Sequence, residues 1–111
     1  MPRRQRALIA RGDVWDAEIP GAGTHPVVVI TRDSAIPALT TVVCALVTST
    51  FHRHVAEVEV GAEAGLTHDS AVNCDNLFTL PKSVLTRRRG RLGPQQTTQL
   101  DRALVIALGI D

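Results

Sequence analysis

The chain has 111 residues, of which 44% are hydrophobic and 21% charged, and its formal net charge is +1. This length supports one hydrophobic core, and the composition is typical of a globular domain rather than of a disordered or fibrous chain. The longest apolar runs, 26–30 and 42–47, are far shorter than a membrane helix, and 7–10 is too short for a secretory signal, so we expect a cytoplasmic protein without a membrane span.

The first half of the chain predicts a series of short strands. A turn signal at Gly12-Asp13 precedes a strand over 14–19, and the glycines and proline of 20–24 indicate a loop. The continuous β-branched run at 27–31 is typical of a strand buried on both faces. A further strand over 39–48 follows, with at most one helical turn between the two.

The second half predicts three more strand regions. Residues 55–60 alternate, with Val55, Glu57 and Glu59 on a solvated face and Ala56, Val58 and Val60 on a buried one. A strand over 70–75 is followed by a segment over 77–80 that Pro81 breaks. The strand predicted over 86–92 carries arginines on both faces, which favours a position at the edge of a sheet.

One amphipathic helix closes the chain. Pro94 suits a first helical turn, and Gly109 is a plausible stop. Between them an apolar stripe recurs at three- and four-residue spacing, formed by Leu100, Ala103, Leu104, Ala107 and Leu108. The sequence therefore predicts a mainly β fold with one C-terminal helix, in which a small bent sheet or barrel packs against that helix.

Cysteines and arginines limit the possible chemistry. Cys44 and Cys74 form no CxxC pair, so we expect two buried free thiols and no zinc site. Basic residues gather near the start of the chain and again at 87–91, whereas the segment between them is acidic overall. This division suits a polyanion bound on one face, although a solvated arginine-rich loop explains the second run equally well.

Three motifs in order then carry a family resemblance. Gly12-Asp13-Val14-Trp15, His25-Pro26-Val27-Val28-Val29 and Val47-Thr48-Ser49 resemble the MazF/PemK-like toxins. The pattern of that family is Gly-[Asp/Glu]-[Val/Ile]-Trp, then Arg-Pro-Val-Val-Val, then a strand that ends in Thr-Ser. The segments 72–77 and 80–82, the basic strand and the closing helix extend the resemblance over about 11–110. Each motif alone is unspecific, and their order and spacing carry the resemblance.

The resemblance implies a fold, an activity and partners. It implies an SH3-like small barrel over 11–111, a homodimer, and a toxin of a type II toxin–antitoxin system. Such a toxin is an endoribonuclease that cleaves single-stranded RNA sequence-selectively, needs no cofactor or metal, and is inhibited by a MazE-like antitoxin. Residues 1–10 become a basic N-terminal extension, either disordered or an arm that touches RNA.

By resemblance, the catalytic pair is His25 and Thr48. The family has arginine at the first position, so His25 departs from its pattern. An unperturbed imidazole titrates at about pH 6.5, so a histidine can act as a general base or acid. It cannot form the paired hydrogen bonds with which a guanidinium binds phosphate. RNA supplies its own 2′-hydroxyl nucleophile, and we expect a 2′,3′-cyclic phosphate and a 5′-hydroxyl as products. An exposed loop histidine and an ordinary strand-end threonine are the alternatives.

Further residues are candidates for RNA contact because of their chemistry. Phe51 offers a stacking surface, His52 and Arg53 offer phosphate contacts, and the amides and carboxylate of 73–76 can read base edges. The full set is Trp15, Arg32, Ser49, Thr50, Phe51, His52, Arg53, Asn73, Asp75, Asn76, Lys82 and Arg87. Packing of Trp15 under the barrel rim and turn formation by Asp75-Asn76 are the competing interpretations. His68 and Asp69 belong to no recognisable constellation.

Two other functions remain open on the sequence. One is a binding protein on the same scaffold that poisons DNA gyrase, as CcdB-like toxins do. The other is a catalytically silent module that binds RNA or the antitoxin. Thr48 and the polar segment 73–76 favour RNA, whereas the missing arginine keeps the gyrase hypothesis open.

Overall fold

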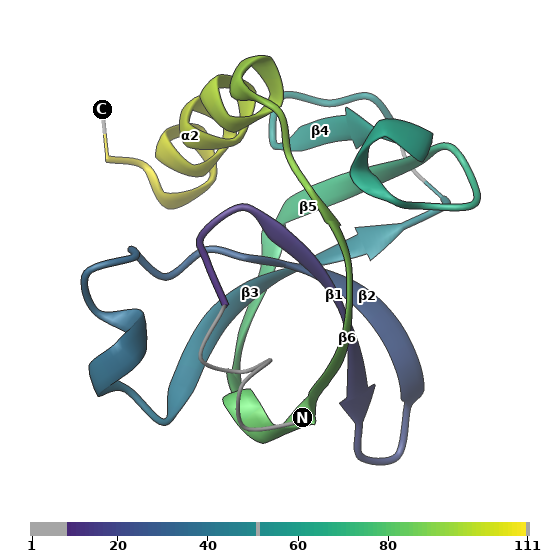
Figure 1. Cartoon of the computed structure of the whole chain (residues 1–111). Helices are drawn as coiled ribbons and strands as arrows, with labels where there is room; N and C mark the ends of the chain where they lie inside the picture. Colours follow the sequence, from purple (N-terminus) through teal and green to yellow (C-terminus); the bar gives the residue numbers. More distant parts are fainter. Residues whose placement is uncertain (1–8, 51, 111) are drawn as a thin grey trace.

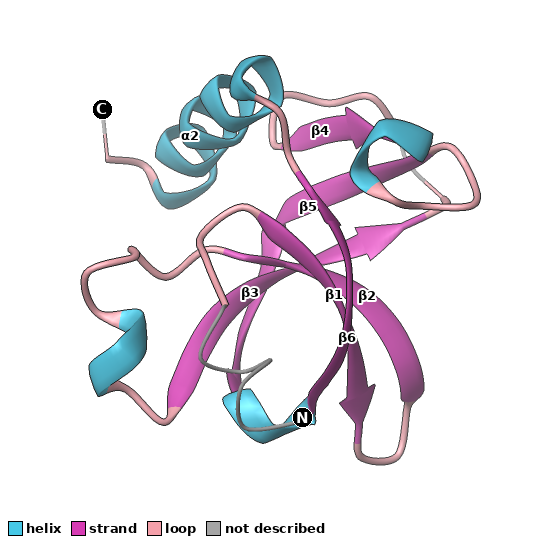
Figure 2. Ribbon diagram, in the orientation of Figure 1, coloured by secondary structure: helices cyan, strands magenta, loops and turns pink. Residues whose placement is uncertain are grey.

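In the described part of the chain, six antiparallel strands and one α-helix make up the fold. The computed structural model describes residues 9–50 and 52–110, leaving 1–8, 51 and 111 outside the description. Within the described residues the strand order is β4-β5-β3-β2-β1-β6, and α2 packs over one end of the curled sheet (Figures 1 and 2). The strands are β1 Asp13–Ile19, β2 Gly23–Val29, β3 Thr41–Thr48, β4 Glu57–Val60, β5 Ser70–Pro81 and β6 Leu85–Arg91. The helix is α2 Pro94–Leu108, and three short 3-10 turns are η1 Ile36–Ala38, η2 Ala62–Ala64 and η3 Lys82–Val84. The predicted mainly β class with one C-terminal helix is confirmed.

The sheet buries side chains on both of its faces. Val27, Val28 and Val29 are 0% exposed. Val28 packs into a cluster with α2, whereas Val27 and Val29 join a second cluster around Trp15. Because successive side chains of a strand point to opposite faces, this split accounts for the continuous apolar run, and the predicted burial on both faces is confirmed.

The two edges of the curled sheet meet through η2. This turn follows edge strand β4, and it packs against β6 at the opposite edge. The contact is made by backbone: a Cβ on Gly65 would lie 2.0 Å from the carbonyl oxygen of Arg89, and one on Gly90 would lie 2.5 Å from that of Ala64. Gly65 also has a φ of +85°, a conformation in which glycine avoids a steric penalty.

Strand β5 is longer than predicted. The structure has one strand from Ser70 to Pro81 instead of separate segments over 70–75 and 77–80. Its pairing with β3 shifts in register, since Ala45 lies opposite Leu77 but Leu46 lies opposite Asn73. The polar residues at this register shift are of types that favour turns, so the sequence predicted a break there. In the structure, pairing with β3 keeps β5 continuous.

The helix begins and ends as the sequence predicts. Pro94 occupies the first turn, and Gly109 ends the helix with a φ of +66° while its N–H donates to the carbonyl oxygen of Ile106. Leu100, Ala103 and Leu104 are buried against the sheet. Leu108 is 56% exposed, so its predicted place in the buried stripe is wrong.

Asp13 anchors β6 and the start of the fold. Its side chain is 1% exposed; Oδ2 accepts from the Ala10 N–H at 2.9 Å, and Oδ1 lies 3.4 Å from Nε of Arg88. Ile9 is buried in the cluster around Trp15. The last two residues of the expected N-terminal extension therefore pack on the domain, while 1–8 lie outside the described residues.

Both cysteines are buried free thiols, as predicted. Burial raises the pKa of the Cys44 thiol to about 12. Burial, and then the charge of Asp75, raises the pKa of Cys74 to about 11. In the described part of the chain, no helix has the length and apolar character needed to cross a membrane.

Candidate functional site

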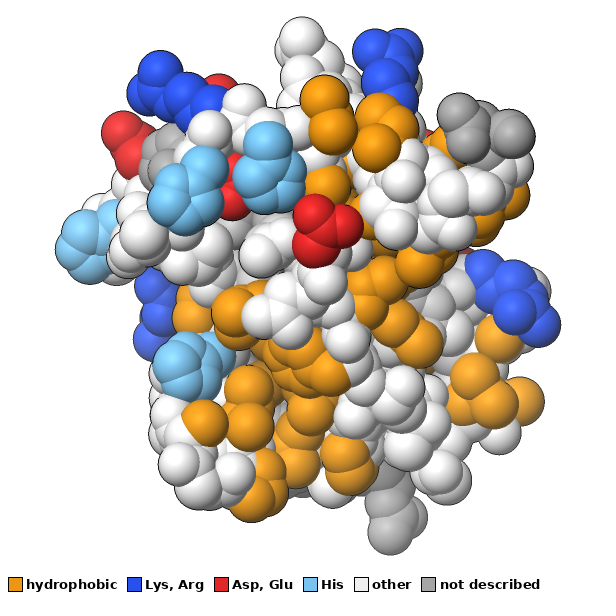
Figure 3. All heavy atoms as spheres, turned by 180° about the vertical axis from the view of Figure 1, so that it is seen from behind, with side chains coloured by type: hydrophobic (Ala, Val, Ile, Leu, Met, Phe, Trp, Pro, Cys, Tyr) orange, Lys and Arg blue, Asp and Glu red, His pale blue; other side chains and the backbone are white. Residues whose placement is uncertain are grey.

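A pocket of about 540 Å³ opens where the strand ends meet the segment after η2. The lining residues come from β1, β2, β3, β5, β6 and the segments that follow β3 and precede β5, and they are Asp16, Thr24, His25, Pro26, Leu46, Val47, Thr48, Ser49, Leu66, Thr67, His68, Ser70 and Arg89. Its volume falls within the roughly 300–1,000 Å³ of ligand pockets. Histidine side chains lie along one side of the face in Figure 3, beside a broad hydrophobic area.

His25 lies in this pocket near the start of β2. Its Nε2 is 2.8 Å from the carbonyl oxygen of Ala22. Because a carbonyl only accepts, Nε2 carries the proton in this contact, and in the neutral ring Nδ1 is then the basic nitrogen. The turn of the β1–β2 hairpin therefore orients the imidazole and selects its tautomer.

Thr48 ends β3 in the same pocket. The β2–β3 ladder ends at Val27 opposite Leu46, and His25 and Thr48 each lie two residues beyond this last pair on their own strand. The Thr48 hydroxyl accepts from the Thr50 N–H at 3.1 Å and lies 3.2 Å from the Thr50 carbonyl oxygen, to which it donates. This local turn fixes the Thr48 hydroxyl at the end of β3. The structure thus places both members of the predicted pair, His25 and Thr48, in one pocket.

Arg89 adds a guanidinium from the basic run at 87–91. Its Nη1 lies 3.3 Å from Oδ2 of Asp16, and its Nε donates to the carbonyl oxygen of Gly65 at 3.2 Å. The side chain is 21% exposed. Sequence analysis selected Arg87 from this run, which is exposed opposite Asp16 in the β1–β6 pairing. The contact between η2 and β6, which holds Arg89 in place, has no signal in the local sequence.

His68 is a second imidazole in the pocket. Its Nδ1 lies 3.0 Å from the hydroxyl oxygen of Thr67, and its carbonyl oxygen accepts from the Ser70 hydroxyl at 3.0 Å. Ser70 is 6% exposed. Sequence analysis assigned no role to His68, because its neighbours in the pocket are distant in the chain.

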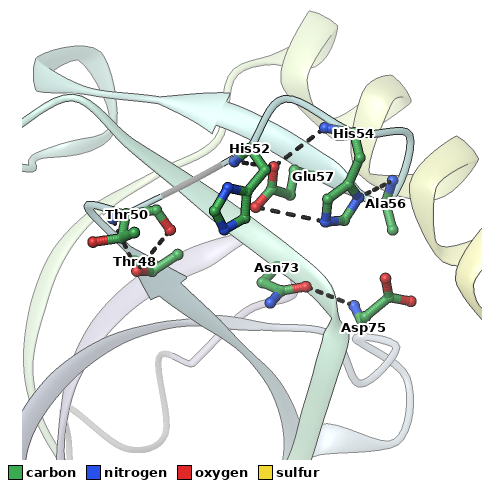
Figure 4. Close-up of polar contacts among 8 residues, drawn as sticks. All are labelled: Thr48, Thr50, His52, His54, Ala56, Glu57, Asn73 and Asp75. Carbon is green, nitrogen blue, oxygen red and sulfur yellow. Dashed lines mark hydrogen bonds and ion pairs between the residues drawn. The ribbon is translucent and has the colours of Figure 1, made fainter.

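The loop that follows Thr48 is organised by Glu57. One of its carboxylate oxygens, Oε1, accepts from the N–H groups of His52 at 2.9 Å and His54 at 3.3 Å, and Oε2 lies 3.7 Å from Nε2 of His54 (Figure 4). Burial by itself raises the pKa of Glu57, but these N–H groups and the charge of His54 outweigh it and hold the pKa below its usual value. The Glu57 side chain is 2% exposed, so the predicted solvated position is wrong for it, whereas Glu59 is exposed as expected.

The polar segment of β5 lies across from this loop. The Asn73 side-chain oxygen accepts from the Asp75 N–H at 3.0 Å, and Asn73 is paired with both Leu46 and Glu57 (Figure 4). Asp75 and Asn76 are exposed. Together with Ser49 and Thr50, this segment extends a polar surface away from the pocket.

Other predicted residues lie elsewhere. Trp15 is 1% exposed, and its Nε1 donates to Asp13 Oδ2 at 3.3 Å, so its predicted contact with RNA is wrong and the packing interpretation is correct. Arg53 has a φ of +56° and lines a separate hollow of about 700 Å³ beside α2. Phe51 lies outside the described residues.

Arg32 and Lys82 are far from the pocket along the strands. Arg32 follows the end of β2 opposite to His25, and Lys82 follows Pro81, which pairs with Thr41 at the start of β3. At about 3.3 Å per strand residue, each is roughly 20 Å along the strands from His25 and Thr48. Lys82 also donates to the carbonyl oxygen of Ile36 at 2.8 Å. A single bound phosphate therefore cannot contact these residues and the pocket together.

Metal-ligating side chains do not cluster in the described part of the chain. Residues 9–50 and 52–110 contain no group of three or more His, Cys, Asp or Glu side chains arranged to hold a metal ion.

Comparisons with known proteins agree with the architecture. Residues 10–108 match a family described as PemK-like, MazF-like toxin of type II toxin–antitoxin system. The chain is 38% identical over 104 residues to the probable endoribonuclease MazF5 of Mycobacterium tuberculosis, covering 92% of this chain and 94% of that protein. It superposes on the Mycobacterium tuberculosis toxin MazF-mt6 with a TM-score of 0.83 and 34% identity, covering 89% and 98% of the two chains.

A further solved structure, an endoribonuclease in complex with its cognate antitoxin from a mycobacterial species, gives a TM-score of 0.85. It is 27% identical, with 93% of this chain and 97% of that chain covered.

Proposed function

Because the chain belongs to the PemK-like, MazF-like toxin family of type II toxin–antitoxin systems, we propose that it is a metal-independent endoribonuclease acting on single-stranded RNA. Relatives that are 37–38% identical over most of the chain are named endoribonucleases. The 2′-hydroxyl of the substrate attacks the adjacent phosphorus, so the chain need only orient the strand, move protons and stabilise charge.

One observation carries the proposal: His25, Thr48 and Arg89 line the same pocket. Nδ1 of His25 is the free basic nitrogen of the neutral ring, and it accepts the 2′-hydroxyl proton. The Thr48 hydroxyl, which otherwise donates to the Thr50 carbonyl, donates to a non-bridging phosphate oxygen. Both steps use side chains that the strand ends already hold in place.

Arg89 supplies the positive charge that the family pattern places at position 25. A guanidinium stabilises a phosphorane through charge-assisted hydrogen bonds, which an imidazole does not reproduce. Asp16 and the Gly65 carbonyl fix this side chain through its Nη1 and Nε atoms. The remaining guanidinium N–H groups are available to phosphate, since arginine has five such donors.

The polar surface beside the pocket is the proposed path of the RNA strand. Ser49, Thr50, His52 and Asn73 lie along it, and single-stranded RNA is recognised by donors and acceptors that meet its splayed bases. Base contacts at Asn73 and at the exposed Asp75-Asn76 segment give the cleavage its sequence selectivity. Arg87, at the rim opposite Asp16, contacts the phosphate backbone.

Two protein partners follow from the family. A MazE-like antitoxin binds the chain and occupies the RNA path; the mycobacterial endoribonuclease solved with its cognate antitoxin supports this partner. A second copy of the chain forms a homodimer. The exposed hydrophobic side chains of the last turns of α2, Val105, Ile106 and Leu108, provide apolar surface for such contacts.

The test is cleavage of a mixed-sequence RNA in excess chelator, with the cut ends mapped. We expect 2′,3′-cyclic phosphate and 5′-hydroxyl ends, no cleavage where deoxyribose replaces the scissile nucleotide, and a loss of about 100-fold or more for His25→Ala or Thr48→Ala. Thr98→Ala, on the exposed side of α2, is the matched control and retains full activity. Absence of cleavage at every pH from 5 to 9 rejects the proposal.

Gyrase poisoning is the competing function. The endoribonuclease names of the relatives support RNA cleavage over it. A supercoiling assay with purified gyrase separates the two, since inhibition of gyrase without RNA cleavage contradicts the proposal.

A further inference from the structure

We propose that His68 is a second catalytic histidine, the general acid that protonates the leaving 5′-oxygen; this inference rests on the proposed ribonuclease function. His68 lines the pocket with His25 and Thr48. None of the sequence motifs includes it. The pocket therefore holds two imidazoles, and transfer of an RNA phosphodiester to its own 2′-oxygen requires two proton transfers.

The strand order places the two imidazoles on elements to either side of β3. His25 belongs to β2, and His68 precedes β5, while β3 lies between these strands and ends at Thr48. Thr48 is paired with Ala71, three positions after His68. Thr48 therefore belongs to the strand that lies between the elements carrying the two histidines, and all three residues line one pocket.

This arrangement fits the geometry of phosphoryl transfer. The attacking and leaving oxygens lie roughly in line on opposite sides of phosphorus. A single imidazole beside the 2′-oxygen is on the wrong side of the phosphate to reach the 5′-oxygen. A second proton-transfer group from another element is needed, and His68 is the imidazole that the pocket provides.

The hydrogen bonds at His68 also suit a proton donor. Its Nδ1 is engaged by the Thr67 hydroxyl at 3.0 Å. When the ring is protonated, Nδ1–H donates to that hydroxyl and Nε2–H remains as the second donor. Among the described residues no hydrogen bond engages Nε2, so this nitrogen is available to the leaving oxygen.

The step balances in atoms and charge. The bond from the 2′-oxygen to phosphorus forms and the bond from phosphorus to the 5′-oxygen breaks. The 2′-hydroxyl proton moves to Nδ1 of His25, and a proton moves from Nε2 of His68 to the 5′-oxygen. The products are a 2′,3′-cyclic phosphate and a 5′-hydroxyl, and exchange with water restores both rings.

The experiment replaces the leaving oxygen by sulfur. A thiolate leaves without protonation because thiol pKa values, about 8.5, lie far below those of alcohols. On ordinary RNA, His68→Ala should reduce the cleavage rate by about 100-fold or more. On RNA with a single 5′-bridging sulfur at the cut site, the same variant should act within a few-fold of the original protein. His25→Ala should remain slow on both substrates.

The pH–rate profile gives a second readout. Other charged groups in the pocket are Asp16 from β1 and Arg89 from β6, which are paired with each other. The original protein should lose activity at high pH as the acid loses its proton, and His68→Ala should lack that limb. Thr67→Val, which removes the partner of Nδ1, should lower the rate several-fold and leave the limb in place.

The outcomes separate this inference from the proposed function. If the original protein cuts no RNA, both are overturned. If it cuts ordinary RNA and His68→Ala cuts equally well, or if sulfur fails to rescue a slow His68→Ala, His68 is not the acid and the proposed function stands. Thermal unfolding of each variant, with Thr98→Ala as control, checks that the exposed His68 is dispensable for folding.

Discussion

Replacing Gly65 by alanine tests how tightly the curled sheet is closed. Gly65 combines two constraints: its φ is +85°, and a Cβ added to it would lie 2.0 Å from the carbonyl oxygen of Arg89. An alanine there must adopt a strained backbone and also push η2 away from β6. Because the same contact positions Arg89, the substitution should affect both stability and the pocket.

The cost follows from these two constraints. A positive φ costs an alanine about 1–2 kcal/mol. Ordinary contact begins near 3.4 Å, so the two backbones must separate by about 1.4 Å, the difference between 3.4 and 2.0 Å. That movement breaks the 3.2 Å hydrogen bond from Arg89 Nε to the Gly65 carbonyl, worth about 1 kcal/mol. We expect a loss of about 2–4 kcal/mol in the free energy of unfolding.

Urea unfolding with two matched variants checks this estimate. Gly21→Ala shares the positive φ, +80°, but meets no atom within 4 Å, so it should cost only the strain. Gly90→Ala has no positive φ but meets the Ala64 carbonyl oxygen at 2.5 Å, so it should cost only the overlap. If Gly65→Ala is no more destabilising than Gly21→Ala, or leaves RNA cleavage unchanged, η2 and β6 are not the closure that holds Arg89.

Other positions give simpler expectations. Glu57→Gln should unfold more easily than the original protein above pH 5, because a carboxylate with a depressed pKa stabilises the fold only while it is ionised. The difference in stability should shrink as the pH falls through the lowered pKa of Glu57. Denaturation across pH 3–7 measures this, and a difference that stays constant contradicts it. Asp13→Asn should cost about 1–3 kcal/mol. The amide oxygen can replace Oδ2, but the amide nitrogen then replaces Oδ1, which lies 3.4 Å from Arg88 Nε and 3.9 Å from Arg91 Nε, and so meets two guanidinium donors; urea unfolding that matches the original protein disproves this. Cys44 and Cys74 should react with iodoacetamide only when the protein unfolds, because burial raises the pKa of both thiols; rapid labelling of the native protein at pH 8 argues against that burial.

The predicted catalytic pair and the pocket around it were accessible to sequence reasoning to different degrees. His25 and Thr48 came from the order of three motifs, and the structure brings them to one pocket. Trp15 was misjudged as an RNA contact because a lone tryptophan carries no local sign of whether it is buried. Arg87 was chosen over Arg89 for a similar reason: four arginines within 87–91 look alike until their partners are known.

The sequence by itself determined what depends on neighbours along the chain. The helix Pro94–Leu108 follows from its proline start, glycine end and apolar spacing, and the burial of Val27–Val29 on both faces follows from an unbroken β-branched run. Only the tertiary structure decided which charged groups share the pocket. Arg89 contacts Asp16 across 73 positions and Gly65 across 24, and His68 lines the same pocket as His25. Such contacts depend on how the sheet bends and where its edges meet, which no local pattern encodes.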